Sequence, residues 1–395
     1  MPEPLLYFKA MGTSALVSAV IALALLKTRC EAGPGWRNFA SAVAISAGLF
    51  AGYGLLSLQL AWPPRNGLDR LLTIIIPLAL CIEVIAAFQH GRLRVAWLLR
   101  LSLAAAVPRI LLHDSVYLRT TGEWTAMQSF ATLATCGCLL FVVWWSMSLL
   151  LKRGARLALP ISICLAAQCA GATVMMAGYI KGGAAAIPLV ATLLATAVVA
   201  WLVKKNTQVE NPVPQIIVGA GVVSLFGILF VGKFFGRVSN EHALAMLFAP
   251  LLCWISELPL LRNRKPWMIA VIQLLAVVIP LTTVLFLSKQ NFDRDMSPLL
   301  GNTEQTSRTG ETQSQLPAEH GTAGEHSDLL LHAPRIVPAD RREGGFHGLA
   351  RMSFLLRQML LNHVLAAVSQ RAIVQKDGPS PQRPDTNRRR CFHRF

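Results

Sequence analysis

The chain has 395 residues, of which 54% are hydrophobic and 14% are charged, and its formal net charge is +17. Soluble domains carry about 25% charged residues, so this composition is typical of a membrane protein. Lys and Arg cluster in short segments between long apolar stretches, where basic residues set orientation and contact anionic lipid headgroups. This placement argues against nucleic acid as the partner of the charge.

Residues 1–290 contain ten apolar stretches separated by short loops. A hydrocarbon core about 30 Å thick takes about 20 residues of helix to cross, and only helices satisfy their own backbone hydrogen bonds in this sequence style. The fourth stretch carries Arg100, Pro108 and Arg109, and a re-entrant or interfacial segment is the alternative there. We predict an all-α polytopic transmembrane bundle with about ten spans, at 10–26, 38–61, 70–89, 93–112, 126–151, 157–180, 184–203, 214–235, 242–261 and 267–288.

The basic residues of the loops predict the orientation of the bundle. With ten spans, the loops after odd-numbered spans hold thirteen Lys and Arg, and the opposite side, without the tail, holds seven. The positive-inside rule then places the N-terminus outside. Lys27 and Arg29 follow the first span, which predicts an uncleaved helix rather than a signal peptide. Short loops and the absence of N-x-S/T sequons indicate a bacterial cytoplasmic (inner) membrane.

The composition changes after about residue 290, so we divide the chain into a bundle, 1–290, and a low-complexity tail, 291–395. The stretch 301–327 is rich in Gly, Thr, Gln, Glu and Ser, which is typical of a disordered linker. Within the mostly disordered tail, 349–368 places apolar residues near one face and predicts an interfacial amphipathic helix.

Two charged residues are predicted to meet inside the bundle. Glu83 lies near the end of the third span and Arg100 near the start of the fourth, and a short loop joins these antiparallel helices. Both side chains therefore lie at the same depth, about 10 Å below the surface at 1.5 Å per residue. We predict an ion pair, which serves either to bury Arg100 or as a binding site for a substrate or proton.

Other charged candidates lie nearer the helix ends. Glu257 is close in sequence to Arg262 and Arg264, so it either extends its carboxylate to the interface or binds a substrate or ion. His113 and Asp114 end the fourth span at the outer face. They are candidates for an acid–base pair, although adjacent helical residues do not face each other and a solvated helix end is the alternative.

Several uncharged motifs predict packing rather than chemistry. Gly48-xxx-Gly52 predicts a close helix contact, and Gln59, Gln168 and Gln273 predict hydrogen bonds between helices. Cys136-Gly-Cys138 lies in an apolar run without a nearby His, so we predict no metal site, and no cofactor motif is present.

The ten spans divide into two halves of five, which would be inverted in the membrane. Inverted repeats with broken helices are a transporter architecture, and Pro108 with Arg100 in one half corresponds in position to Pro250 with Glu257 in the other. We predict a secondary transporter or permease for an unknown small molecule or ion. The alternatives are a non-catalytic sensor or accessory subunit, and an intramembrane enzyme for a lipid-linked substrate that would use His113, Asp114, Arg119 and Glu123.

Overall fold

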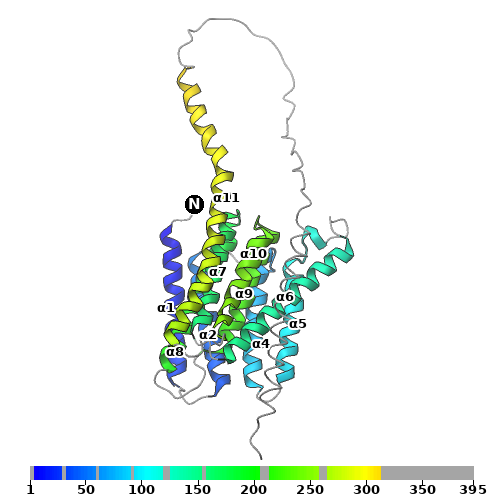
Figure 1. Ribbon diagram of the computed structural model, residues 1–395, viewed down its shortest axis with the longest axis vertical. Helices are drawn as coiled ribbons and strands as arrows, with labels where there is room; N and C mark the ends of the chain where they lie inside the picture. Colours follow the sequence, from blue (N-terminus) through cyan, green and yellow to red (C-terminus); the bar gives the residue numbers. More distant parts are fainter. Residues whose placement is uncertain are drawn as a thin grey trace, which may run out of the picture. The chain divides into compact units, whose positions relative to one another are not determined.

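The described part of the chain is helical and contains no strand (Figure 1). The computed structural model describes residues 4–28, 33–58, 62–89, 93–118, 125–153, 157–204, 213–257 and 265–312. All of them belong to the unit Met1–Leu316. The predicted amphipathic helix at 349–368 and most of the predicted tail lie outside the described residues.

Each of the ten predicted spans corresponds to helical structure, which confirms the all-α polytopic bundle. The elements are α1 (Pro4–Thr28), α2 (Pro34–Leu55), α3 (Gly67–Arg70), the π-helix η1 (Leu71–Ile75), α4 (Ile76–Phe88), α5 (Leu93–Leu111), the 3-10 helix η2 (Val116–Leu118), α6 (Ala126–Lys152), α7 (Ala158–Met176), α8 (Ile180–Lys204), α9 (Gln215–Phe234), α10 (Asn240–Phe248), the 3-10 helix η3 (Ala249–Glu257) and α11 (Pro266–Thr312). Within the described residues, eight helices are long and apolar enough to cross a membrane.

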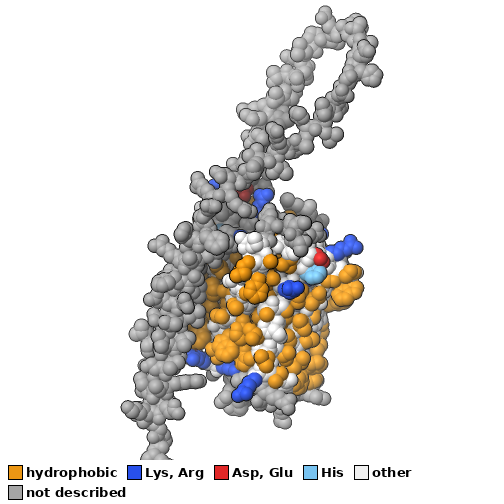
Figure 2. All heavy atoms as spheres, turned by 90° about the vertical axis from the view of Figure 1, so that its right-hand side faces the viewer, with side chains coloured by type: hydrophobic (Ala, Val, Ile, Leu, Met, Phe, Trp, Pro, Cys, Tyr) orange, Lys and Arg blue, Asp and Glu red, His pale blue; other side chains and the backbone are white. Residues whose placement is uncertain are grey.

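The surface of the bundle matches a bilayer. On the face shown in Figure 2, hydrophobic side chains form a belt, with Lys and Arg mainly toward its two ends. Large apolar side chains on α11, such as Leu275 and Ile279, are 55% and 64% exposed. Contact of these side chains with water would be costly, whereas lipid tails solvate them, so the chain is an integral membrane protein.

The two remaining predicted spans are α5 and the α10–η3 segment. Although α5 carries three Arg residues, it is one continuous helix that packs against α4, α6 and α9. The ninth span changes from α-helix to 3-10 helix at Ala249, next to Pro250. Proline has no N–H and clashes with the preceding turn, which explains the change. Gln273 of α11 donates to the carbonyl oxygen of Cys253 at 2.9 Å, as predicted for an interhelical hydrogen bond.

The third span contains a π-helical turn, η1, just before Pro77. Pro77 cannot donate to the carbonyl one α-helical turn before it, and the N–H of Ile76 bonds instead to the carbonyl of Leu71, five residues back. The helix continues from η1 into α4, which ends five residues beyond Glu83. The π-turn thus lies in the same span as the predicted ion pair.

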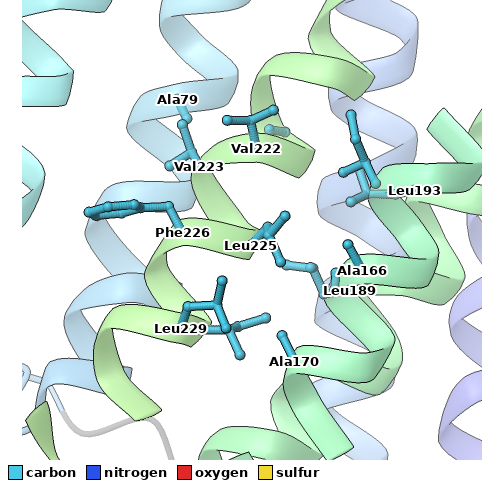
Figure 3. Packing of buried hydrophobic residues seen from close by; sticks show 14 of the residues in the cluster. Ala79, Ala166, Ala170, Leu189, Leu193, Val222, Val223, Leu225, Phe226 and Leu229 are labelled. Atoms are coloured by element: carbon cyan, nitrogen blue, oxygen red, sulfur yellow. The ribbon is translucent and has the colours of Figure 1, made fainter. Parts of the chain in front are cut away.

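The centre of the bundle is α9, which is buried along nearly its whole length. It contacts α2, α4, α5, α6, α7, α8 and α10. Figure 3 shows α9 side chains, including Val222, Leu225 and Leu229, among residues of α4, α7 and α8. A helix that is apolar all round has this position because no face of it favours water.

Helices α1, α2 and α8 pack closely through small residues, which confirms the predicted contact of Gly48 and Gly52. A Cβ atom at Gly48 would lie 2.5 Å from Thr192 Cγ2 and 2.8 Å from the carbonyl oxygen of Ser14. One at Gly52 would lie 2.7 Å from Pro188 Cβ. Glycine therefore allows the three backbones to approach.

The last helix extends beyond its predicted span. Loss of apolar residues after 288 marks the exit from hydrocarbon, whereas α11 continues to Thr312. Leaving the bilayer does not end a helix, because its hydrogen bonds are internal. Lys289 and Asp293, one turn apart and both exposed, favour its continuation in water. The first part of the stretch predicted as a linker is therefore helical.

Candidate functional site

Glu83 of α4 and Arg100 of α5 form a bidentate ion pair, which confirms their predicted contact. Arg100 Nε donates to Glu83 Oε1 at 2.9 Å, and Arg100 Nη2 donates to Glu83 Oε2 at 2.7 Å. The Glu83 side chain is 1% exposed and that of Arg100 is 4% exposed. Two parallel bonds between a guanidinium fork and a carboxylate are the strongest arrangement for such a pair. That the pair binds a substrate or a proton stays a prediction.

Helix α9 approaches the pair closely because residue 219 is glycine. A Cβ atom there would lie 2.5 Å from Glu83 Oε1 and 2.8 Å from Glu83 Cγ. One turn earlier, the Gln215 amide lies against the guanidinium, and with its oxygen turned toward Arg100 it accepts from Nη1 at 3.3 Å and from Nη2 at 3.0 Å. Gln215 and Gly219 are four residues apart and share one face of α9, which therefore recognises the whole pair.

The first turn of α9 is fixed by α2. Its N-cap residue, Pro214, makes no side-chain capping bond, and the Oδ1 atom of Asn38 accepts from the backbone N–H of Ile216 at 2.9 Å. Asn38 is buried, so this bond satisfies one of the four N–H groups that a helix start leaves open. The positive end of the α9 dipole therefore lies beside the ion pair inside the bundle.

Two tryptophans surround the guanidinium. The Cζ atom of Arg100 is 4.8 Å from the ring centroid of Trp97 and 5.9 Å from that of Trp144. These distances are in the cation–π range. Trp97 in turn contacts Trp145 and Phe141, at ring-centroid distances of 4.1 and 6.2 Å. An aromatic wall from α5 and α6 thus adjoins the charged pair.

Two buried donors of α6 have no hydrogen-bond acceptor. The indole N–H of Trp144 is close to the Glu83 carboxylate but does not reach hydrogen-bond geometry, and the hydroxyl of Ser148 has no partner. Trp144 and Ser148 are 0% and 1% exposed and lie one helical turn apart on the same face of α6. Buried polar groups are paired in the large majority of cases, so both require an explanation.

Glu257 does not join this site. Its Oε2 atom lies 3.4 Å from Nη1 of Arg153, at the end of α6, and both side chains are well exposed. Arg262 and Arg264, its expected neighbours, lie outside the described residues. Arg153 also lies 5.1 Å from the ring centroid of Trp254. An exposed pair of this kind contributes little to stability and is consistent with a carboxylate that reaches the interface.

His113 and Asp114 do contact each other, against the argument that adjacent helical residues face apart. His113 Nδ1 lies 2.9 Å from Asp114 Oδ2, and the side chains are 67% and 71% exposed. Because α5 ends at Leu111, both residues lie in a turn, where Asp114 has a φ of 55°. Arg70 bonds to the His113 carbonyl oxygen, and its Nη2 is 3.5 Å from Asp114 Oδ2. The predicted partners Arg119 and Glu123 lie outside the described residues.

Several polar residues of the interior were not predicted from the sequence. Gln215 and Trp144 approach the pair from α9 and α6, Ser148 is buried one turn beyond Trp144, and Asp69 is buried in α3. The charge of Asp69 acts on Tyr179, in the α7–α8 connection: burial, and secondly this charge, raise the pKa of the Tyr179 hydroxyl. The Gln215-xxx-Gly219 spacing is a signal that could have drawn attention to this face of α9.

The three glutamines that were predicted to form hydrogen bonds between helices have different outcomes. Gln273 forms its bond, Gln59 lies outside the described residues, and Gln168 is exposed on α7.

Among the residues that the structure describes, no three or more His, Cys, Asp or Glu side chains gather in a metal-binding group. Comparisons with protein-family models and with curated proteins found no match to the chain.

Proposed function

We propose that this integral membrane protein is a secondary transporter or permease and that the Glu83–Arg100 pair lies on the path of its solute. One observation supports the proposal most: polar side chains of α4, α5, α6 and α9 converge on one buried point inside the bundle. Charge within a membrane is costly, and charged groups that face the bundle interior tend to mark substrate or ion paths.

A purely structural role explains the pair less well. A buried ion pair adds little to stability compared with apolar residues of similar volume, because removing two charges from water costs about as much as their attraction returns. The unsatisfied donors of Trp144 and Ser148 add a further cost without a structural benefit. The irregular turns at η1 and η3 are also typical of helices that move or line a path.

A second candidate function is a non-catalytic sensor or accessory subunit, and the almost complete burial of the pair favours it.

The two halves of the bundle differ in the contacts between their helices. In the described residues α7 packs against α9 and α11, whereas α1 makes no comparable contact with the corresponding helices α4 and α6. The two halves therefore do not pack in the same way, and the proposal depends on the buried site rather than on an exact repeat.

We further propose the orientation given by the loop charges, with the N-terminus outside and the bundle in a bacterial inner membrane. In that orientation the end where α4 and α6 finish and α5 and α9 begin faces the cytoplasm. The pair then lies near the cytoplasmic end, where the exposed side chains of Lys27, Lys152 and Arg153 also lie. Basic residues at this end favour anionic lipid headgroups.

Water access to the site distinguishes the two candidates. In a protein whose native cysteines are replaced, Ser148→Cys should react with a membrane-impermeant, charged thiol reagent from the cytoplasmic side and, in a second state, from the outside. Alternating access of a transporter requires both. A matched control is Leu98→Cys on α5, which is 63% exposed to lipid and should stay unreactive. Labelling from one side only, or from neither, would contradict transport and favour the accessory role.

A further inference from the structure

We infer that the solute at this site is a small organic carboxylate, which Arg100 binds in place of the Glu83 carboxylate. This inference rests on the proposed transport function and names its substrate class. The bound geometry is already present in the protein itself: two carboxylate oxygens accept from Nε and Nη2 of Arg100 at 2.9 and 2.7 Å. Glu83 thus occupies the position that a carboxylate from solution would take.

The site contains more hydrogen-bond donors than acceptors. The Arg100 guanidinium has five N–H donors, and the acceptors on it are the Glu83 carboxylate and the Gln215 amide oxygen. The Trp144 N–H lies beside the Glu83 carboxylate without forming a hydrogen bond, and the Ser148 hydroxyl, one turn further along α6, is also buried without an acceptor. A carboxylate offers about four acceptor positions. An anion next to Arg100 would therefore satisfy groups that the protein alone leaves unpaired.

The electrostatics of the site favour an anion. The charges of Glu83 and Arg100 offset each other, and the start of α9 adds a partial positive charge of about 0.5. This start is buried between α2 and the pair, so water screens it weakly. A cation would meet donors rather than acceptors here. A phosphate would bring a second negative charge, for which the described site has no second cationic side chain, so a carboxylate fits better.

Exchange of carboxylates requires a proton. When the solute takes over Arg100, Glu83 is left buried without a cation, and a carboxylate in that position binds a proton because an isolated buried charge is too costly. The solute anion and one proton thus enter together, and no covalent bond other than O–H changes. On the described helices that pack against α4, Arg100 is the charge that acts on Glu83.

The test measures thermal unfolding of the full-length protein in lipid nanodiscs with three carboxylates and their neutral amides: glycolate and glycolamide, succinate and succinamide, benzoate and benzamide. At least one carboxylate should raise the unfolding temperature by about 3 °C at saturation, and its amide should not. The dissociation constant should fall up to about tenfold for each pH unit from 7.5 to 5.5, because binding takes up one proton.

Variants separate binding from folding. Arg100→Gln should abolish the carboxylate shift. Ser148→Ala should weaken the shift at least about fivefold in dissociation constant, while the ligand-free protein unfolds at the same or a higher temperature, because an unpaired buried hydroxyl is gone. The matched control is Ser102→Ala on α5, an exposed serine whose hydroxyl bonds within its own helix. It should change neither value.

The outcomes also separate this inference from the function on which it rests. Three results would overturn the assignment of a carboxylate as the solute. They are equal shifts in unfolding temperature from carboxylates and amides, no shift from any carboxylate, and shifts that persist in Arg100→Gln. If Ser148→Cys is still labelled from both sides, the transport path remains and only the solute class is wrong. If that cysteine is also unreactive from the outside, the proposed function fails as well.

Discussion

Replacing Glu83 by Gln should lower the free energy of unfolding by about 3–5 kcal/mol, because it leaves the Arg100 guanidinium buried and without a counter-charge. Arg100 is 4% exposed and its two bonds to Glu83 fix the α4–α5 contact. A guanidinium does not lose its proton in proteins, so it has no way to become neutral. Denaturant or thermal unfolding in nanodiscs measures the loss.

The two matched controls are Arg100→Gln and the double variant Glu83→Gln with Arg100→Gln. Arg100→Gln should cost less than Glu83→Gln, because a lone Glu83 can bind a proton. The double variant should recover a large part of the stability, since no unpaired charge remains. A double variant as unstable as Glu83→Gln alone would show that the charges do not depend on each other in this way.

The second large effect is expected at Gly219, where Gly219→Ala should destabilise the protein by about 1–3 kcal/mol through overpacking. The new Cβ atom would lie 2.5 Å from Glu83 Oε1 and 2.8 Å from its Cγ, and the pair leaves little room for movement. The penalty therefore arises from displacement of α9 or of Glu83, and it is measured by the same unfolding experiment.

Gly12 provides the matched control, because it is also a helical glycine within a span, but a Cβ atom added there would meet no atom of a neighbouring helix within 4 Å. Gly12→Ala should be neutral or stabilising by up to about 1 kcal/mol from helix propensity. In a background that carries Glu83→Ala and Arg100→Ala, Gly219→Ala should lose most of its penalty. A penalty that persists there would place the clash elsewhere than at the ion pair.

Prediction from the sequence worked where local geometry decides the contact. Glu83 and Arg100 lie on consecutive antiparallel helices, so loop length alone sets them at one depth. The approach of Gln215 and Trp144 could not be derived in this way. It depends on how α6 and α9 are rotated about their axes, and that rotation follows from packing between segments far apart in the chain.

The helix ends show a second limit of the sequence. Apolar patterning marks where a chain enters and leaves hydrocarbon, which is why each predicted span corresponds to helical structure and eight of the described helices are long and apolar enough to cross a membrane. It does not mark where a helix stops. The turn after Leu111 brings His113 and Asp114 together, and α11 extends to Thr312. Asp69 and Arg70, at the start of the third span, are both buried, which the sequence did not indicate.

Uptake of a labelled carboxylate into proteoliposomes tests the central claim most directly. The solute is the carboxylate of the nanodisc panel that stabilises the protein most, and an inward proton gradient drives its entry. We expect uptake above that of protein-free vesicles, lost in Arg100→Gln and retained in Ser102→Ala, with protons entering alongside the solute. Uptake equal to that of protein-free vesicles, or uptake unchanged in Arg100→Gln, would contradict a solute path through the Glu83–Arg100 pair.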